Sequence, residues 1–446
     1  VLLLVACVNV ANLLLVRATT RAREFAAREA LGASRRRLAG VLLLEGLILA
    51  LTAATLGIVL SFVGVGLAKS MLPAGLTRVQ DIAVDGRVLM VTVSVAGLCG
   101  LVFSSAPAWL AGRSDLVGLM KTGGGAVIGG QRRNRLLSVF LVADMAFVCV
   151  LLVATALVVT SFILVTTADL GFDRRNVMTF SYQRALQEGD EADRAAAAAV
   201  LRTELLNRAI SVPGVISAAI ATNASTPLSG GSVRYSIDIP GIGQTTREDW
   251  PETRLVTPDY FRVMGMQLIR GRMFEPSDGV GAPRVLLINE VAARRFFPDR
   301  DPIGQVVTFR GPTTIIGVLR AVHMNGPEIE VRPEMYTPAD QEEPRYQRAA
   351  GHLVVRTDRD PRLLTAAVRE AIRPALAAEP PQPQFVDDDF RRLTAGRRFN
   401  ARLMAVFGLI AVAIGAIGVY GTMEFVVAQQ VPAIGLRMAL GASTSR

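Results

Sequence analysis

The sequence predicts an α-helical transmembrane bundle joined to an α+β extracytoplasmic domain. Apolar residues make up 51% of the 446 positions, the mean hydropathy is +0.39 and only 19% of residues are charged, which is less charge than a cytosolic enzyme normally carries. Apolar stretches long enough to cross a bilayer exclude a water-soluble protein. The apolar excess is concentrated in stretches with almost no charge, and the remaining sequence has an ordinary polar composition. These stretches are residues 1–16, 38–68, 88–112, 136–168 and 403–427.

Each apolar stretch is expected to form one helix. A helix needs roughly 20 apolar residues to cross about 30 Å of hydrocarbon, so two helices and a turn would need about 40. Residues 38–68 and 136–168 are too short for two crossings. We therefore predict that each is a single long helix that tilts or projects beyond the bilayer.

The arginines orient this bundle. Dense basic groups lie between the first and second apolar stretches and between the third and fourth, whereas residues 69–87 are only weakly basic. Cytoplasmic loops carry an excess of Lys and Arg, so the two basic loops are placed inside and residues 169–402 outside the cytoplasm. Residues 113–135, rich in Gly and Arg, are interpreted as a cytoplasmic linker. The net charge of +10 thus follows the topology, and no nucleic-acid partner is expected.

The large polar region is predicted to be α+β. Two similar strand-helix-strand patterns flank residues 225–349, which favours one split subdomain with a strand-rich insertion. The predicted strands are residues 177–182, 215–221, 352–356 and 384–386, and the predicted helices are residues 191–210 and 360–378.

The most specific pattern is a repeat whose copies lie 409 residues apart. Arg28-Glu-Ala-Leu-Gly-Ala-Ser34 matches Arg437-Met-Ala-Leu-Gly-Ala-Ser443, and each copy follows an apolar span. Duplication of this kind indicates a membrane protein with internal pseudo-symmetry.

Each copy of the repeat is predicted to form a short amphipathic helix. Gly32 and Gly441 stand where such a helix would end in the left-handed conformation. In the first copy, Glu24 and Arg28 are four residues apart and should pair on one helix face. An interfacial helix that merely anchors the turn to anionic lipid fits the position and Arg content equally well. The repetition favours a shaped surface that docks a partner.

These residues carry a family resemblance. The first copy, from Arg23-Glu24-Phe25 through Ala30-Leu31-Gly32, resembles the signature of FtsX-like permease domains of the MacB type of ABC transporter. Five segments of the polar region resemble the MacB-type periplasmic core domain. They are Val256-Thr-Pro-Asp-Tyr-Phe261, Gly265 through Arg270-Gly-Arg272, Ile288-Asn-Glu290 through Arg294-Arg-Phe-Phe-Pro298, Asp301-Pro-Ile-Gly304, and Ile316-Gly-Val318 leading to Pro333-Glu-Met-Tyr336.

The order of these parts resembles the duplicated subgroup, in which two four-helix permease units are fused in one polypeptide. The resemblance assigns residues 1–112 to the permease block of unit one with its first helix truncated, and residues 136–168 to the first helix of unit two. Residues 169–402 would be the core domain, and residues 403–446 would begin the second permease block. The chain is accordingly expected to be an internal fragment.

The resemblance implies a permease of the bacterial inner membrane that exports or extracts substrates. ATP hydrolysis by a partner ATPase would move the extracytoplasmic domain, so this chain is expected to hold no catalytic residue, metal or cofactor. The implied partners are the lipid bilayer, the ATPase subunit and an extracytoplasmic partner such as a periplasmic adaptor. The positions that match the ATPase-coupling helix are Glu24, Phe25, Arg28, Leu31 and Gly32, with Ile434, Arg437, Leu440 and Gly441 in the second copy. Ala433 stands where the first copy has Glu24, which argues against symmetric engagement of two ATPases.

Motifs of enzymes are missing from the sequence. It contains no G-x-x-x-x-G-K-[ST] phosphate loop, so ATP hydrolysis is assigned to another chain. His323 and His352 have no spaced partners for a metal or a nucleophile and are interpreted as structural. The alternative function is an FtsX-like membrane scaffold or regulator that acts on extracytoplasmic partners without transport.

Three acidic residues, Glu45, Asp144 and Glu424, lie within the apolar stretches. A charge at the centre of a bilayer costs about 2.5–3.5 kcal/mol on insertion scales. All three lie nearer one surface than the midplane, so interhelical or interfacial pairing, including pairing with arginines, is favoured over a proton relay. The last stretch also carries a strip of small residues for close packing, at Gly415, Gly418 and Gly421.

Overall fold

The contacts within the chain divide it into two units. The helical unit comprises Val1–Ile163 and Ala395–Arg446, and the sheet unit comprises Leu164–Thr394. The computed structural model describes residues 1–20, 24, 28, 34–71, 85–113, 130–184, 190–222, 226–228, 233–344, 349–376 and 378–439.

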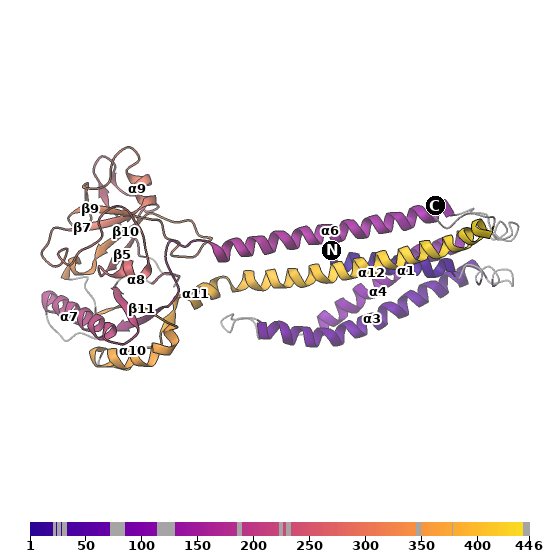
Figure 1. Cartoon of the computed structure of the whole chain (residues 1–446), viewed down its shortest axis with the longest axis horizontal. Coiled ribbons are helices and arrows are strands. Elements are labelled where there is room, and N and C mark those ends of the chain that lie inside the picture. The colour runs from indigo at the N-terminus through magenta and orange to yellow at the C-terminus, as the bar shows by residue number, and fades with distance from the viewer. Residues whose placement is uncertain are drawn as a thin grey trace. The chain divides into compact units, whose positions relative to one another are not determined.

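Long helices form the helical unit, and each contains one of the predicted apolar stretches (Figure 1). Many of their apolar side chains are exposed, which is typical of helices that face lipid. The prediction of one helix for each stretch is therefore confirmed. The helices are α1 (Leu2–Thr20), α3 (Arg35–Met71), α4 (Gly86–Arg113), α6 (Gly130–Thr167) and α12 (Ala395–Ala439).

Three of these helices are long and apolar enough to cross a membrane within the described residues. The candidate spans are Leu43–Leu67 in α3, Leu141–Thr167 in α6 and Ala395–Glu424 in α12. Shorter apolar segments occur in α1 and α4, at Leu2–Leu14 and Gly86–Val102.

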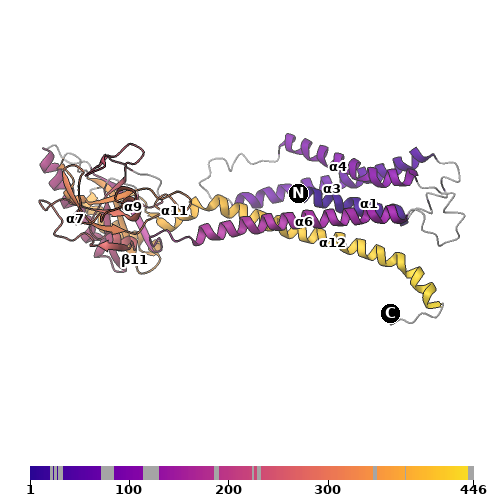
Figure 2. The same cartoon turned by 90° about the horizontal axis from the view of Figure 1, so that it is seen from above.

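The helices approach one another closely where small residues line the contact. A Cβ atom added to Gly100 of α4 would lie 2.6 Å from Cβ of Ala50 and 3.3 Å from the carbonyl oxygen of Gly46, both on α3. Only glycine permits so short a separation between these two helices. Helix α1 packs against both α4 and α12 (Figure 2).

The sheet unit is built on one mixed sheet. Its strand order is β12-β1-β11-β2-β5-β10-β7-β9-β8-β3-β4, and β6 pairs with β9. The strands are β1 (Val177–Gln183), β2 (Val215–Ala221), β3 (Asp238–Ile239), β4 (Gly243–Gln244), β5 (Glu252–Val256), β6 (Leu268–Gly271), β7 (Val285–Asn289), β8 (Val306–Thr308), β9 (Pro312–Leu319), β10 (Glu334–Pro338), β11 (Ala350–Thr357) and β12 (Gln384–Phe385).

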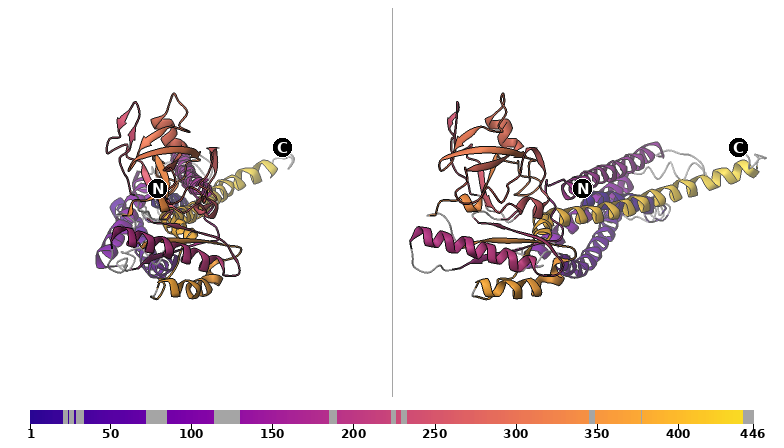
Figure 3. Two further views of the ribbon diagram at one scale, coloured as in Figure 1. Left: turned by 90° about the vertical axis from the view of Figure 1, so that its left-hand side faces the viewer. Right: turned by 60° about the vertical axis from the view of Figure 1, so that its left-hand side comes forward.

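The two predicted strand-helix-strand patterns lie together at one end of this sheet. β11 pairs antiparallel with both β1 and β2, and β12 pairs with β1. Helices α7 (Glu191–Ile210) and α10 (Pro361–Leu376) pack side by side on one face of these strands (Figure 3). The strands and helices predicted here are confirmed, with ends that differ by at most two residues.

Alternating side chains of these strands fill two cores on opposite faces. Phe180 and Leu353 point toward α7 and α10, whereas the neighbouring Val354 and Ala219 point to the other face. That second face is covered by α8 (Tyr260–Met264) and α11 (Val386–Leu393). The period of two follows from strand geometry, and it makes this end of the sheet a three-layer structure.

The strand-rich insertion continues the same sheet. β2 meets β5 through a single paired position, Ala221 with Val256, and β5 then runs parallel to β10. A third core lies among β7, β8, β9 and α9 (Glu290–Phe296). The insertion thus has its own core while it shares the sheet with the split subdomain.

Candidate functional site

The first copy of the coupling repeat is described at two positions. Glu24 and Arg28 are helical, and their side chains form an ion pair with 2.6 Å between Oε1 and Nη2. The predicted pair on one helix face is therefore confirmed. Both side chains remain almost half exposed, so the pair adds little to stability and its charges stay accessible. Phe25, Leu31 and Gly32 lie outside the described residues.

The second copy differs from the prediction. Ile434 and Arg437 lie in the last turns of the continuous helix α12, so the expectation of a separate short helix is wrong here. The segment before them contains Ala, Gln and Val but no glycine, and Pro432 does not end the helix. Leu440 and Gly441 lie outside the described residues.

The intramembrane acids occupy different environments. Glu45 is half-buried in α3 and Glu424 is exposed on α12, whereas Asp144 of α6 is buried. The partner of Asp144 is an amide on another helix, because Nδ2 of Asn9 on α1 donates to Oδ1 of Asp144 at 3.1 Å. The bond is interhelical, as expected, but the described partner is not an arginine.

Asn9 joins three helices. Its Nδ2 also donates to the carbonyl oxygen of Ile414 on α12 at 3.2 Å, so one amide bridges α1, α6 and α12. One turn further along α1, Nδ2 of Asn12 donates to Oγ1 of Thr422 at 2.6 Å. Asn9, Asn12, Asp144 and Thr422, all buried, form what we term the polar clasp of the helical unit.

The glycine strip of α12 faces two different helices. A Cβ atom on Gly415 would lie 3.0 Å from Cγ2 of Val148 on α6. A Cβ atom on Gly421 would lie 3.2 Å from Cδ2 of Leu13 on α1, and one on Gly418 would overlap Asn9. The strip therefore allows close packing of α12 against α6 at Gly415 and against α1 at Gly418 and Gly421.

The sheet unit holds a buried charge cluster between β5 and β10. Nη2 of Arg254 lies 3.2 Å from Oε2 of Glu252 and 3.2 Å from Oε1 of Glu334, and the hydroxyl of Tyr336 donates to Oε2 of Glu334 at 2.8 Å. Parallel pairing of β5 with β10 sets Glu252 opposite Glu334, which places both carboxyl groups beside Arg254.

Burial dominates the electrostatics of this cluster. It raises the pKa of Glu334, and the positive charge of Arg254 and the bond from Tyr336 offset only part of that rise. For Arg254 burial acts to lower the pKa, but the nearby charges, Glu334 foremost, leave the net pKa above its ordinary value. Within the described residues the cluster is closed to solvent, so it is a structural device and offers no reactive surface.

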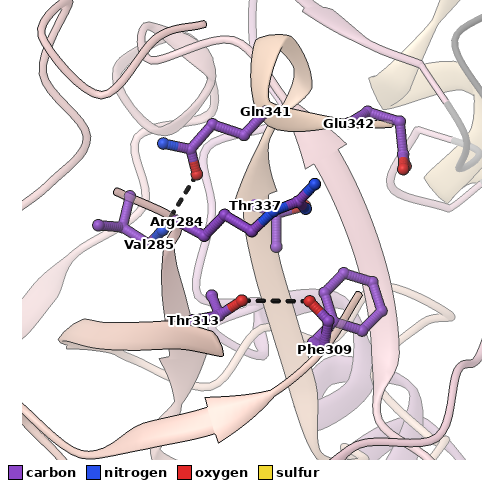
Figure 4. Close-up of a pocket in the computed structure, with 7 residues that line it drawn as sticks. All are labelled: Arg284, Val285, Phe309, Thr313, Thr337, Gln341 and Glu342. Carbon is purple, nitrogen blue, oxygen red and sulfur yellow. Dashed lines mark hydrogen bonds between the residues drawn. The ribbon is translucent and has the colours of Figure 1, made fainter. Parts of the chain in front are cut away.

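A cavity of about 10 Å³ lies beside this part of the sheet (Figure 4). Its walls are tied by two hydrogen bonds, from the amide of Val285 to Oε1 of Gln341 at 3.0 Å and from Oγ1 of Thr313 to the carbonyl oxygen of Phe309 at 3.1 Å. That volume suits about one water molecule. Nothing much larger than a water molecule fits in this cavity.

The two histidines are not brought together. His352 lies on β11 with its Nδ1 3.1 Å from Oγ of Ser181, and burial lowers its pKa. His323 lies in a loop, where its backbone amide donates to the carbonyl oxygen of Leu170. Within the described residues no group of three His, Cys, Asp or Glu side chains is arranged to hold a metal ion.

Sequence reasoning missed the asparagines of the clasp. Asn9 and Asn12 interrupt an apolar run at a spacing of three residues, which puts both on one helix face. Polar amides inside a membrane span mark helix contacts, so their spacing was the available signal. Their partners could not be read from the sequence, because the contacts join positions more than 130 residues apart.

Candidate membrane spans together with a separate mixed α/β unit are typical of a membrane protein with a folded domain outside the bilayer. The family model for the MacB-like periplasmic core domain matches residues 145–375, and the model for the C-terminal domain of FtsX-like permeases matches residues 1–117. The first match spans more than half of the sequence. The chain therefore belongs to the MacB/FtsX-like family of ABC transporter permeases.

Individual relatives agree with this assignment. The macrolide export ATP-binding/permease protein MacB of Agrobacterium fabrum is 25% identical over 252 residues, which cover 53% of this chain and 35% of the relative. A MacB protein of Paracoccus denitrificans is 27% identical over 237 residues, covering 52% of this chain and 33% of the relative. The chain thus spans about a third of the length of these curated relatives.

The chain is also similar to a solved structure, at a lower sequence identity than to these relatives. The periplasmic region of MacB from Actinobacillus actinomycetemcomitans is 17% identical with a TM-score of 0.36, over 49% of this chain and 92% of that structure.

Proposed function

We propose that this chain is the permease part of a MacB-type ABC transporter in the bacterial inner membrane. A separate nucleotide-binding subunit hydrolyses ATP, and the resulting motion passes through the helices to the extracytoplasmic sheet unit, which exports or extracts substrates. The observation that carries this proposal is the continuity of α12 from the end of the sheet unit to the second coupling position.

The length of α12 supports mechanical transmission. Its 45 residues give about 68 Å at 1.5 Å per residue, more than twice the roughly 30 Å of hydrocarbon. It begins at Ala395, directly after the last residue of the sheet unit, and still includes Arg437. One continuous helix therefore links Arg437 to the residue that directly follows the sheet unit in sequence.

Close packing couples α12 to α6. Oγ1 of Thr155 on α6 donates to the carbonyl oxygen of Met404 at 3.2 Å, and a Cβ atom on Gly408 would lie 3.0 Å from that same Oγ1. The helices that precede and follow the sheet unit in sequence, α6 and α12, are thus in direct contact. A tilt of α12 is therefore expected to move α6 with it.

The two coupling positions have unequal chemistry. The first copy presents the accessible Glu24–Arg28 pair, whereas the second has Ala433 in place of the acid. An ATPase that recognises both charges would engage the first copy more strongly. We propose that the two ATPase subunits of a dimer contact this chain asymmetrically.

The test uses substitutions that lower the helix stability of α12 between the membrane span and Arg437. In the full-length protein, Gln429→Gly with Gln430→Gly is compared with Gln429→Ala with Gln430→Ala, since glycine disfavours a helix by about 1 kcal/mol per residue relative to alanine. Both proteins are reconstituted with their ATPase, and export and ATP hydrolysis are measured. Loss of export with retained hydrolysis in the glycine variant alone is expected. Equal export by both variants would contradict mechanical transmission.

A second comparison tests the partner. Arg28→Glu should reduce the amount of ATPase that co-purifies by about tenfold, as reversal of an interfacial charge commonly does. Arg37→Glu, an exposed arginine outside the matched positions, is the control and should leave co-purification unchanged. If no ATPase co-purifies with the parent protein, the scaffold alternative is favoured over transport.

A further inference from the structure

The contact between α1 and α12 follows the internal repeat. The spacing of 409 residues that relates Arg28 to Arg437 makes Gly418 the equivalent of Asn9. It likewise makes Gly421 the equivalent of Asn12, and Thr422 the equivalent of Leu13. Contacts between the two helices can therefore be compared position by position.

These contacts are reciprocal. Asn12 of α1 donates to Thr422, which is the equivalent of position 13. Leu13 of α1 packs on Gly421, which is the equivalent of position 12. An interface in which position 12 meets 13 and position 13 meets 12 is the signature of a two-fold axis. Advancing three residues on α1, from Asn9 to Asn12, also advances the contact on α12, so the helices run parallel.

The position nearest this local axis is occupied differently in the two copies. Asn9 lies over Gly418, its own equivalent, and a Cβ atom on Gly418 would come within 2.6 Å of Cγ of Asn9. One copy thus supplies a side chain and the other supplies the space for it. A pair of α1 helices would oppose two asparagines at this point, and a pair of α12 helices would oppose two glycines.

The polar clasp fixes the orientation of that asparagine. Nδ2 of Asn9 reaches both the carbonyl oxygen of Ile414 and Oδ1 of Asp144. Removal of Asp144 would leave a buried amide hydrogen without this acceptor, which is unfavourable inside an apolar bundle. Asp144 is therefore a positioning residue for the contact between α1 and α12.

We propose that α1 and α12 are the two copies of one duplicated helix, paired about a local two-fold axis, and that the Asn9–Gly418 complementarity selects this pairing. The same complementarity disfavours the pairing of α1 with α1 from separate chains, because two asparagines would then meet at the axis. Specificity of this kind rests on a clash in the wrong pairs as well as on contacts in the correct one.

The test uses disulfide cross-linking in the full-length protein in membranes. Cys7, Cys99 and Cys149 are replaced by Ala, and Leu13→Cys with Gly421→Cys marks the helix contact. Two chains with tags of different length are co-expressed and oxidised with copper phenanthroline. We expect a cross-link within one chain, with no band that joins the two tags. A dominant band joining the two tags would overturn the proposal.

A pair of variants tests the complementarity itself. Gly418→Asn places two asparagines at the axis and should lower the yield of the cross-link on the order of fivefold, which corresponds to about 1 kcal/mol of helix pairing. Adding Asn9→Gly exchanges the two residues and should restore at least half of the parental yield. Because the second variant repairs the first, its failure to restore the cross-link contradicts the proposal, as does an unchanged yield with Gly418→Asn.

Discussion

The guanidinium of Arg254 lies 3.2 Å from the carboxylate of Glu334, and both side chains are only 2% exposed. The two residues come from neighbouring parallel strands, with Glu252 beside them as a second acid. Two carboxyl groups and one guanidinium are thus enclosed in the sheet without access to bulk solvent.

Breaking this pair should be strongly destabilising. Arg254→Met leaves Glu252 and Glu334 facing each other in a buried site, and we expect a loss of about 3–5 kcal/mol in the free energy of unfolding. Urea unfolding followed by the fluorescence of Trp250, with Trp109 replaced by Phe, measures it. Arg294→Ala removes an exposed ion pair and serves as the control, with an expected loss of at most about 1 kcal/mol. Equal losses for the two variants would contradict the structure.

Acid should weaken the sheet unit through Asp278. Hydrogen bonds from Arg272, at 2.7 and 2.9 Å, and from the backbone amide of Glu275 hold the pKa of Asp278 below its ordinary value of 3.8, against the effect of burial. A lowered native pKa gives a stability contribution that is present above pH 3.8 and lost as the pH falls through the native pKa.

Asp278→Asn removes that contribution together with its pH dependence. The variant should be less stable than the parent at neutral pH, and the difference should shrink as the pH falls below 3.8. The measurement is the urea midpoint at a series of pH values. A difference that stays constant across the series would count against the ion pair.

Two glycines with the same backbone conformation should respond differently to alanine. Gly271 and Gly243 have φ of +84° and +87°, so either substitution strains the backbone by about 1–2 kcal/mol. A Cβ atom on Gly271 would in addition lie 2.6 Å from Cα of Gly317 on β9, whereas Gly243 faces open space. We expect Gly271→Ala to lower the unfolding midpoint well beyond Gly243→Ala, and comparable midpoints would be inconsistent with the tight β6–β9 contact.

The orientation in the membrane can be tested at two exposed positions. In a cysteine-free protein, Ile242→Cys at the turn between β3 and β4 should react with a membrane-impermeant maleimide added outside intact spheroplasts. Ser34→Cys, on the side that the arginines place in the cytoplasm, should react only after the membrane is opened. The reverse pattern would invert the proposed topology.

Local patterns account for what the sequence predicted well. Charge-free stretches specify long helices such as α3. The start of α7 at Glu191 is specified by its N-cap, because the side chain of Asp190 accepts a hydrogen bond from the backbone amide of Asp193. The repeat around Arg28 and Arg437 was visible because it lies in the sequence itself.

Contacts between distant segments could not be predicted. The Arg254–Glu334 pair depends on the parallel register of β5 and β10, and the Asn9–Asp144 bond depends on how α1 crosses α6. The second copy of the repeat was predicted as a separate short helix, whereas α12 continues without a break through Pro432 to Ala439.

The strands at which the chain enters and leaves the sheet unit are neighbours. β1 follows α6 and β12 precedes α11 and α12, and the two strands pair at Met178 with Phe385 on the edge of the sheet. At the opposite end, β4 lies ten strand spacings from β12, roughly 48 Å along the sheet at about 4.8 Å per strand. The chain thus enters and leaves the sheet unit at the same edge of the sheet. A rotation of the sheet unit about that edge would therefore displace the β3–β4 turn much farther than β1.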